Sequence, residues 1–211
     1  MAAEAVRRGT RMTNIVFMGM GEPLHNYDNV MAAVRRINDS DAVALGARRI
    51  TISTVGLVPG IRRLADENLQ VGLAVSLHAP DDDVRARLIP SARKYTIDDI
   101  LAACAEYQKR TGRRVTFEYC LIEGVNDSPD QGRRLAQRIK HLRSHVNVIP
   151  VNPTEAGDIR RPSYERTLAF QRAVREGGVV CTVRVEKGIE IAAGCGQLRG
   201  LELGRAKARE Q

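Results

Sequence analysis

Short runs of β-branched and other apolar residues alternate along the chain with longer stretches that carry apolar residues at helical spacing. Runs of the first kind predict strands, and stretches of the second kind predict amphipathic helices. The predicted strands are Asn14–Met18, Arg49–Ser53, Val71–Ser76, Val115–Leu121, Val146–Pro150 and Val179–Val185. The predicted helices lie near residues 28–38, 59–67, 82–88, 97–110, 129–143 and 163–176.

Several helix boundaries carry local signals. Pro59 is placed at a first helical position, Thr96 and Ser128 are placed as N-caps, and Gly112 and Gly177 follow helix ends. A strand followed by a helix, repeated six times, predicts a parallel sheet with helices outside it. The strands are nearly continuously apolar, which predicts that both faces of the sheet are covered.

Six βα units are fewer than the eight of a closed barrel of about 250 residues. The predicted fold class is therefore α/β, an open and partial βα barrel that lacks one unit. Residues 1–12 are expected to be the tail of a preceding helix and a linker. Residues 13–200 are expected to form one incomplete core, and residues 201–211 a frayed tail.

Composition narrows the class of protein. With 211 residues, 43% of them hydrophobic, the chain can bury one substantial core. No apolar run approaches the roughly 18 residues of a membrane span, and the N-terminus lacks the apolar region of a secretory signal. The four cysteines are far apart and are expected to be reduced thiols. These features predict a cytoplasmic protein without a membrane partner.

The chain is strongly basic, with a formal net charge of +8. It has 28 arginines and 5 lysines, and many arginines come as doublets, such as Arg48-Arg49 and Arg113-Arg114. The planar guanidinium suits phosphate, which favours a nucleic acid partner. A solvated basic surface is the alternative, and the chain has no RGG segment and few aromatic residues for base stacking. Charge alone leaves both interpretations open.

The segments that follow the predicted strands carry the candidate chemistry. In a parallel sheet, ligands bind beyond the carboxyl ends of the strands. Polar groups flanked by glycine or proline follow five of the six strands. The segments after all six strands read GMGEP (19–23), TVG (54–56), SLHAP (76–80), EGVND (123–127), PVNP (150–153) and IAAGCGQL (191–198).

Each polar residue has a functional and a structural interpretation. Glu22 follows glycines that let a ligand approach the backbone, and its carboxylate suits an ammonium group, although a plain turn has the same residues. Ser53 and Ser76 can bond ribose hydroxyls or cap helices. His78 can donate to the same ligand or be satisfied structurally, and Asn152 between prolines suits a turn or a ligand contact.

Cys195 differs from the other cysteines of the chain. It lies in a glycine- and alanine-rich segment at the expected mouth of the barrel, where an accessible thiol is a candidate nucleophile. The remaining cysteines lie in predicted helices and strands and are expected to pack in the core, namely Cys104, Cys120 and Cys181.

The motifs GMGEP, STVG, SLHAP, IPVNP and AAGCGQL, in this order and spacing, resemble those of one family. They are similar to the radical S-adenosylmethionine methyltransferases that modify C2 of an adenosine in 23S rRNA, and to their C8-methylating relatives. The resemblance runs from about Asn14 to Gly200. It implies a partial barrel of the radical S-adenosylmethionine type that lacks its first βα unit.

By position, the resemblance implies that Gly21 and Glu22 bind the methionine end of S-adenosylmethionine. Four further residues and Asn152 line the rest of that pocket, namely Ser53, Ser76, Leu77 and His78. Cys195 matches the cysteine that is S-methylated and then passes its methyl carbon to the base by radical chemistry.

The resemblance also implies a 4Fe-4S cluster held by CxxxCxxC, an electron donor such as flavodoxin, and 23S rRNA and tRNA as substrates of a monomeric enzyme. The chain contains no CxxxCxxC motif, so the metal ligands are expected upstream of residue 1. We therefore expect the isolated chain to be inactive. The alternatives are C8 methylation of adenosine and a cluster-free remnant that only binds RNA or nucleoside.

Overall fold

The fold is given by a computed structural model, which describes residues 9, 12–18, 21–89, 94–152 and 159–184. Six strands form one parallel sheet in the order of the sequence. The strands are β1 (Ile15–Phe17), β2 (Ile50–Thr54), β3 (Gly72–Ser76), β4 (Val115–Leu121), β5 (Ser144–Pro150) and β6 (Val180–Val183). The described part of the chain shows no pairing between β6 and β1, so the predicted open sheet is confirmed.

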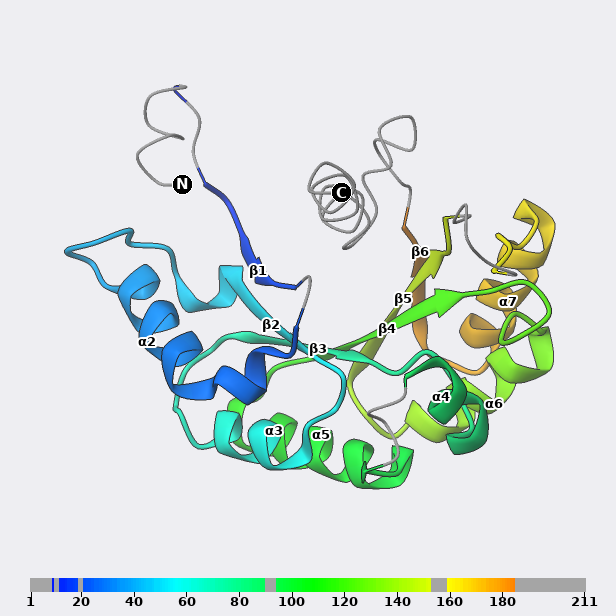
Figure 1. Cartoon of the computed structure of the whole chain (residues 1–211), viewed down its shortest axis with the longest axis horizontal. Helices are drawn as coiled ribbons and strands as arrows, with labels where there is room; N and C mark the ends of the chain where they lie inside the picture. Colours follow the sequence, from blue (N-terminus) through cyan, green and yellow to red (C-terminus); the bar gives the residue numbers. More distant parts are fainter. Residues whose placement is uncertain (1–8, 10–11, 19–20, 90–93, 153–158, 185–211) are drawn as a thin grey trace, which may run out of the picture.

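The helices lie along the convex side of the curved sheet (Figure 1). Right-handed crossovers between strands in sequential order place every helix on the same face. The α-helices are α2 (Tyr27–Asn38), α3 (Val58–Ala65), α4 (Asp82–Leu88), α5 (Ile97–Thr111), α6 (Pro129–Ile139) and α7 (Tyr164–Glu176). Two 3-10 turns precede α2 and β2, namely η1 (Pro23–Asn26) and η2 (Ala47–Arg49).

Among the described residues, the expectation that both faces of the sheet are covered holds only for its centre, where the inner-facing residues Ser53, Ala74 and Glu118 are buried, and it fails for β5. Alternate residues of β5 are buried and half-buried, which is the pattern of a sheet covered on one side. The helix-facing residues, such as Phe117 and Val146, are fully buried. The inner face carries polar and small residues, such as Thr116 and Asn147. A concave polar surface is therefore open to ligands.

The predicted caps are present where the sequence indicates them. Thr96 and Ser128 each form a capping box, with Asp99 and Gln131 respectively. Gly112 ends α5 in the left-handed conformation, with φ of +65°. The signals lie within one helical turn, so they can be read without knowledge of tertiary contacts.

Several predicted boundaries differ from the structure by one or two residues, and one differs by four. Helix α6 was expected to reach residue 143 but ends at Ile139, because residues 140–143 turn back to bring Ser144 beside Val115. The first strand is limited to three residues of the five predicted. The last predicted residue of the sixth strand, Val185, lies outside the described residues, and the domain boundaries at 12 and 200 stay predictions.

Candidate functional site

A pocket of about 200 Å³ lies at the carboxyl ends of β1 to β5. Five of the predicted cofactor residues line it, namely Gly21, Glu22, Ser53, Ser76 and His78. The structure therefore brings together side chains that are up to 57 positions apart in the sequence. The other lining residues are Phe17, Met18, Pro23, Thr54, Val55, Glu118, Cys120 and Ile149.

Glu22 joins two of the loops that form the pocket. Its Oε1 accepts a hydrogen bond of 2.9 Å from the N–H of Leu24, and its Oε2 accepts one of 2.7 Å from the N–H of Val55. The carboxylate thus caps η1 and holds the loop after β2. Each carboxylate oxygen has two lone pairs, so Glu22 can still accept a bond from a ligand ammonium. The preceding Gly21 has φ of +95°, a conformation that glycine adopts without strain.

The two serines at the strand ends are not helix caps. Thr54, next to Ser53, stabilises the loop that precedes α3, because its Oγ1 accepts from the N–H groups of Gly56 at 3.1 Å and Leu57 at 3.2 Å. Neither the Ser53 nor the Ser76 hydroxyl makes a hydrogen bond within the part of the chain that the structure describes. Both hydroxyls are therefore available to a ligand in the pocket.

His78 has an unusual backbone and a fixed tautomer. Its φ is +60°, a left-handed conformation that costs energy for a residue with a side chain. Its Nδ1 accepts a hydrogen bond of 3.1 Å from the N–H of Cys120, so the ring hydrogen resides on Nε2. Burial, and then the charge of Arg85, lower the pKa of His78 to about 4. At neutral pH the ring is uncharged and can donate from Nε2.

Asn126 holds His78 in this conformation, and sequence reasoning did not identify it as a site residue. The Asn126 side chain is fully buried. Its Nδ2 donates to the carbonyls of His78 at 2.8 Å and Cys120 at 2.6 Å. Its Oδ1 accepts from the N–H of Ile122 at 2.7 Å. The only local signal was its place after the fourth predicted strand.

Arg85 is a second residue that the sequence did not identify. This arginine of α4 is 1% exposed, and its Nη2 donates to the carbonyls of Val55 and Ser76. It therefore ties the loop after β2 to the end of β3, as Glu22 ties that loop to η1. A buried arginine is rare unless it is hydrogen-bonded, but sequence alone cannot reveal the burial.

The floor of the pocket contains Glu118 and Cys120 of β4. Glu118 is 6% exposed, and its Oε2 accepts a bond of 2.7 Å from Nδ2 of Asn147. Burial raises the pKa of the Glu118 carboxyl, and the bond from Asn147 opposes that rise. Cys120 is half-buried and lines the pocket, so the expectation that it packs in the core is wrong. Cys104 and Cys181 are fully buried, as predicted.

Two of the predicted site residues that the structure describes do not line this pocket. The Leu77 side chain is 1% exposed and belongs to the hydrophobic core, and the Leu77 N–H donates to the carbonyl of Glu118. The side chain of Asn152, beyond β5, accepts a bond of 3.0 Å from Arg161. Cys195 lies outside the described residues.

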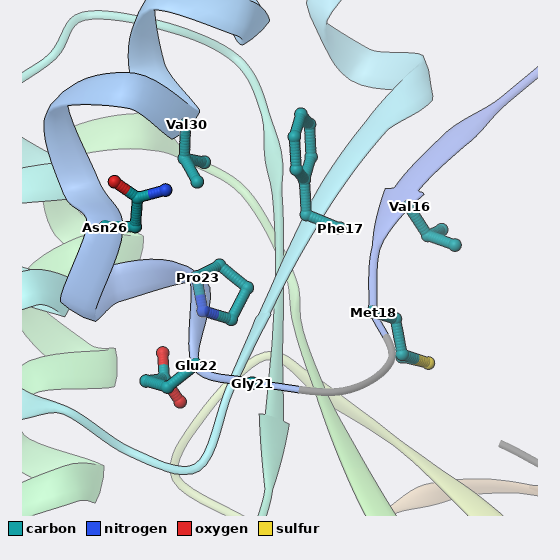
Figure 2. A pocket seen from close by; sticks show the side chains of 8 residues that line it. All are labelled: Val16, Phe17, Met18, Gly21, Glu22, Pro23, Asn26 and Val30. Carbon is teal, nitrogen blue, oxygen red and sulfur yellow. The ribbon is translucent and has the colours of Figure 1, made fainter. Parts of the chain in front are cut away.

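A second hollow of about 480 Å³ adjoins the pocket beside β1 (Figure 2). The two share the residues Phe17, Met18, Gly21, Glu22 and Pro23, so they form one continuous depression. Figure 2 shows Val16 and Met18 on one side of this hollow and Glu22, Pro23 and Asn26 on the other. The depression thus offers a ligand a route between the sheet edge and α2.

Comparison with known proteins assigns this chain to a family. Residues 1–136 match the model of the radical SAM superfamily. The chain belongs to the radical SAM superfamily. The superfamily uses S-adenosylmethionine and, in general, a 4Fe-4S cluster.

Two curated relatives and one solved structure are similar over most of the chain. "Ribosomal RNA large subunit methyltransferase N" of Nitrosopumilus maritimus is 54% identical over 92% of this chain. "Probable dual-specificity RNA methyltransferase RlmN" of Symbiobacterium thermophilum is 50% identical over 94% of it. The crystal structure of a radical SAM methyltransferase from Sphaerobacter thermophilus is 52% identical, with a TM-score of 0.89, over 93% of this chain and 57% of that one. The chain spans 55% and 54% of the two curated relatives, about half of their length.

The pocket fits S-adenosylmethionine by the chemistry of its groups. Glu22 is an acceptor for an ammonium, two seryl hydroxyls are available for ribose, and His78 offers one neutral donor. The described residues do not fit an iron–sulfur cluster, because they contain no group of three cysteine, histidine or acidic side chains that could hold a metal ion. No helix among the described residues is long and apolar enough to cross a membrane.

Proposed function

We propose that this chain is the cofactor-binding part of an RNA methyltransferase that modifies C2 of an adenosine in 23S rRNA and in tRNA. The observation that carries the proposal is the convergence of Glu22, Ser53, Ser76 and His78 on one pocket, in a chain about half identical to proteins named as RNA methyltransferases. S-adenosylmethionine, when bound, supplies an activated methyl group.

The residues of the chain bind and orient that cofactor. Glu22 accepts from the ammonium of its methionine end, beside the open backbone of Gly21. Ser53 and Ser76 bond the ribose hydroxyls, and the Nε2–H of His78 donates to the same ligand. Leu77 contributes through its backbone, and Asn152 closes the pocket beyond β5. The thiol of Cys195 would take up this methyl group with loss of its proton, releasing S-adenosylhomocysteine, and would then pass the methyl carbon to the base.

In this proposal the cluster is held by residues outside the 211-residue sequence, and electrons come from a donor such as flavodoxin. Methylation at C8 of adenosine is the near alternative, because the same pocket serves both reactions. The second candidate is a cluster-free protein that binds RNA or nucleoside without methylating it.

Binding of S-adenosylhomocysteine to the 211-residue chain tests the pocket. Ser53→Ala and Ser76→Ala should each weaken binding about five- to tenfold, because each removes one hydrogen bond of about 1 kcal/mol. Ser40→Ala is the matched control, since Ser40 lies on an exposed turn and bonds only to its neighbour Asp41 within the described ranges. Equal affinities for all three variants would refute the assignment of the serines.

Methylation tests the reaction. The chain is joined in frame to an upstream CxxxCxxC segment, reconstituted with iron and sulfide without oxygen, and incubated with 23S rRNA and tRNA. Nucleoside mass spectrometry should detect 2-methyladenosine and no product with Cys195→Ala, whereas Cys104→Ala, a change in the buried core, should retain activity. 8-Methyladenosine would establish the near alternative, and RNA binding without any product would establish the binding protein.

A further inference from the structure

A second cavity lies at the opposite end of the sheet, where the strands begin. This hollow of about 600 Å³ is lined by residues from the amino ends of β2 to β6. Thr51 of β2 and Thr116 of β4 lie on the inner face, because they alternate with the buried residues of their strands. Four residues separate Thr116 from Cys120 along β4, about 13 Å, so the hollow is separate from the pocket described above.

Arginines surround this hollow. Arg114 immediately precedes β4, Arg143 immediately precedes β5, and both line the cavity. Arg114 lies close enough to His145, on the inner face of β5, for its charge to lower the pKa of that histidine, together with the larger effect of burial. Arg48 and Arg49 precede β2 at the same edge, because the strands are parallel. We call Arg48, Arg49, Arg114 and Arg143 the arginine rim.

The positive charge of the rim is not neutralised by neighbouring carboxylates. None of the four arginines takes part in an ion pair within the described ranges, and no acidic residue lines the hollow. Elsewhere the described arginines of α3 and α6 are paired, for example Arg62 with Glu106. Within the described residues, Arg143 donates to the carbonyl of Gly112 and Arg49 to that of Thr13, and the side chains of Arg48 and Arg114 make no hydrogen bond. Their remaining N–H groups are open to an anion.

We propose that the arginine rim binds the phosphodiester backbone of RNA, outside the methylation pocket. Guanidinium groups bind phosphate oxygens through paired hydrogen bonds, and the threonine hydroxyls in the hollow add further donors. The charges extend along the starts of three strands instead of closing around one point, which suits successive phosphates better than one small anion. The inference rests on the proposed function, which supplies RNA as the substrate.

RNA binding by the 211-residue chain tests the inference. The probe is a labelled single-stranded 20-nucleotide RNA, and its affinity is measured over a range of salt concentrations. The logarithm of the binding constant falls linearly with the logarithm of the salt concentration. In Arg114→Gln/Arg143→Gln this slope should become less steep by about 1.4, which is about 0.7 for each phosphate that the variant no longer neutralises. The matched control Arg62→Gln/Arg133→Gln removes the same charge from ion-paired helix positions and should change the slope by less than half as much.

The outcomes separate this inference from the proposed function. If the wild type binds RNA but the two double variants have the same slope, the rim assignment is wrong and the methyltransferase proposal is untouched. If the wild type binds no RNA, both fail. Competition by millimolar inorganic phosphate would overturn the RNA assignment in favour of a free anion. If the double variant misfolds, Arg114→Gln alone replaces it, because the Arg114 side chain makes no hydrogen bond within the described residues. This single variant should make the slope less steep by about 0.7.

Discussion

Acidification is expected to destabilise the protein through His78. In the folded chain the pKa of His78 is about 4, against an ordinary value of 6.5, because the ring is buried beside Arg85 and its Nδ1 already accepts the N–H of Cys120. As the pH falls below 6.5, His78 becomes protonated in the unfolded chain but stays neutral in the folded chain. The stability that is present above pH 6.5 is therefore lost between about pH 6.5 and pH 4.

The magnitude follows from the two pKa values. The difference between 6.5 and about 4 corresponds to about 3 kcal/mol in the free energy of unfolding. This is a large part of the 5–15 kcal/mol that typical domains possess. Burial and the charge of Arg114 also lower the pKa of His145, so that residue adds a loss of the same sign.

Urea unfolding of the wild type and of His78→Asn, measured from pH 7.5 to pH 4, isolates the contribution of His78. Asparagine tolerates the left-handed backbone of this position and does not titrate. The variant should lose about 3 kcal/mol less than the wild type over this range, and His141→Asn, at an exposed turn, should behave as the wild type. Parallel curves for the wild type and His78→Asn, or a His78 imidazole that titrates near 6.5 by NMR, would refute the reasoning.

Three further substitutions test the supports of the pocket. In the same urea titration, Gly56→Ala should lower the free energy of unfolding by about 2 kcal/mol, because φ of Gly56 is +101° and the new Cβ would lie 2.5 Å from Cδ1 of Ile100. Gly112→Ala is the control: its φ is also positive but the space around it is open, so it should lower the free energy of unfolding by about 1 kcal/mol. Asn126→Ala should lower the free energy of unfolding by about 3 kcal/mol, because it leaves two carbonyls and one N–H unpaired in the interior. A melting temperature within 2 °C of the wild type, which corresponds to roughly 1 kcal/mol or less, would contradict this. Burial raises the pKa of the Glu118 carboxyl, so its ionisation reduces the stability of the protein as the pH rises above the ordinary pKa of a glutamate. Glu118→Gln should therefore be more stable than the wild type at pH 7 and show no such loss. A variant that is less stable at pH 7 would show that the folded protein favours the charged form.

The described fold and the location of the pocket could be predicted from local patterns. The alternation of strands and helices predicts a parallel sheet, and the capping boxes at Thr96 and Ser128 depend on residues three positions apart. The carboxyl ends of parallel strands must lie at one edge, so the loops containing Glu22, Ser53 and His78 had to meet there. The sequence therefore predicted which loops meet at this edge.

The chemistry within those loops was decided by contacts between distant residues. Only the tertiary structure shows that Ser53 faces the pocket while the hydroxyl of its neighbour Thr54 bonds to the loop before the next helix, because the orientation of a side chain at a strand end is not encoded in the residue type. Asn126 fixes the backbone of His78 from 48 positions away, and Glu22 bonds to Val55 across 33 positions. Hydrogen bonds of this range depend on packing in three dimensions, so the sequence by itself determined the loops and the tertiary structure determined the orientation and protonation of the groups in them.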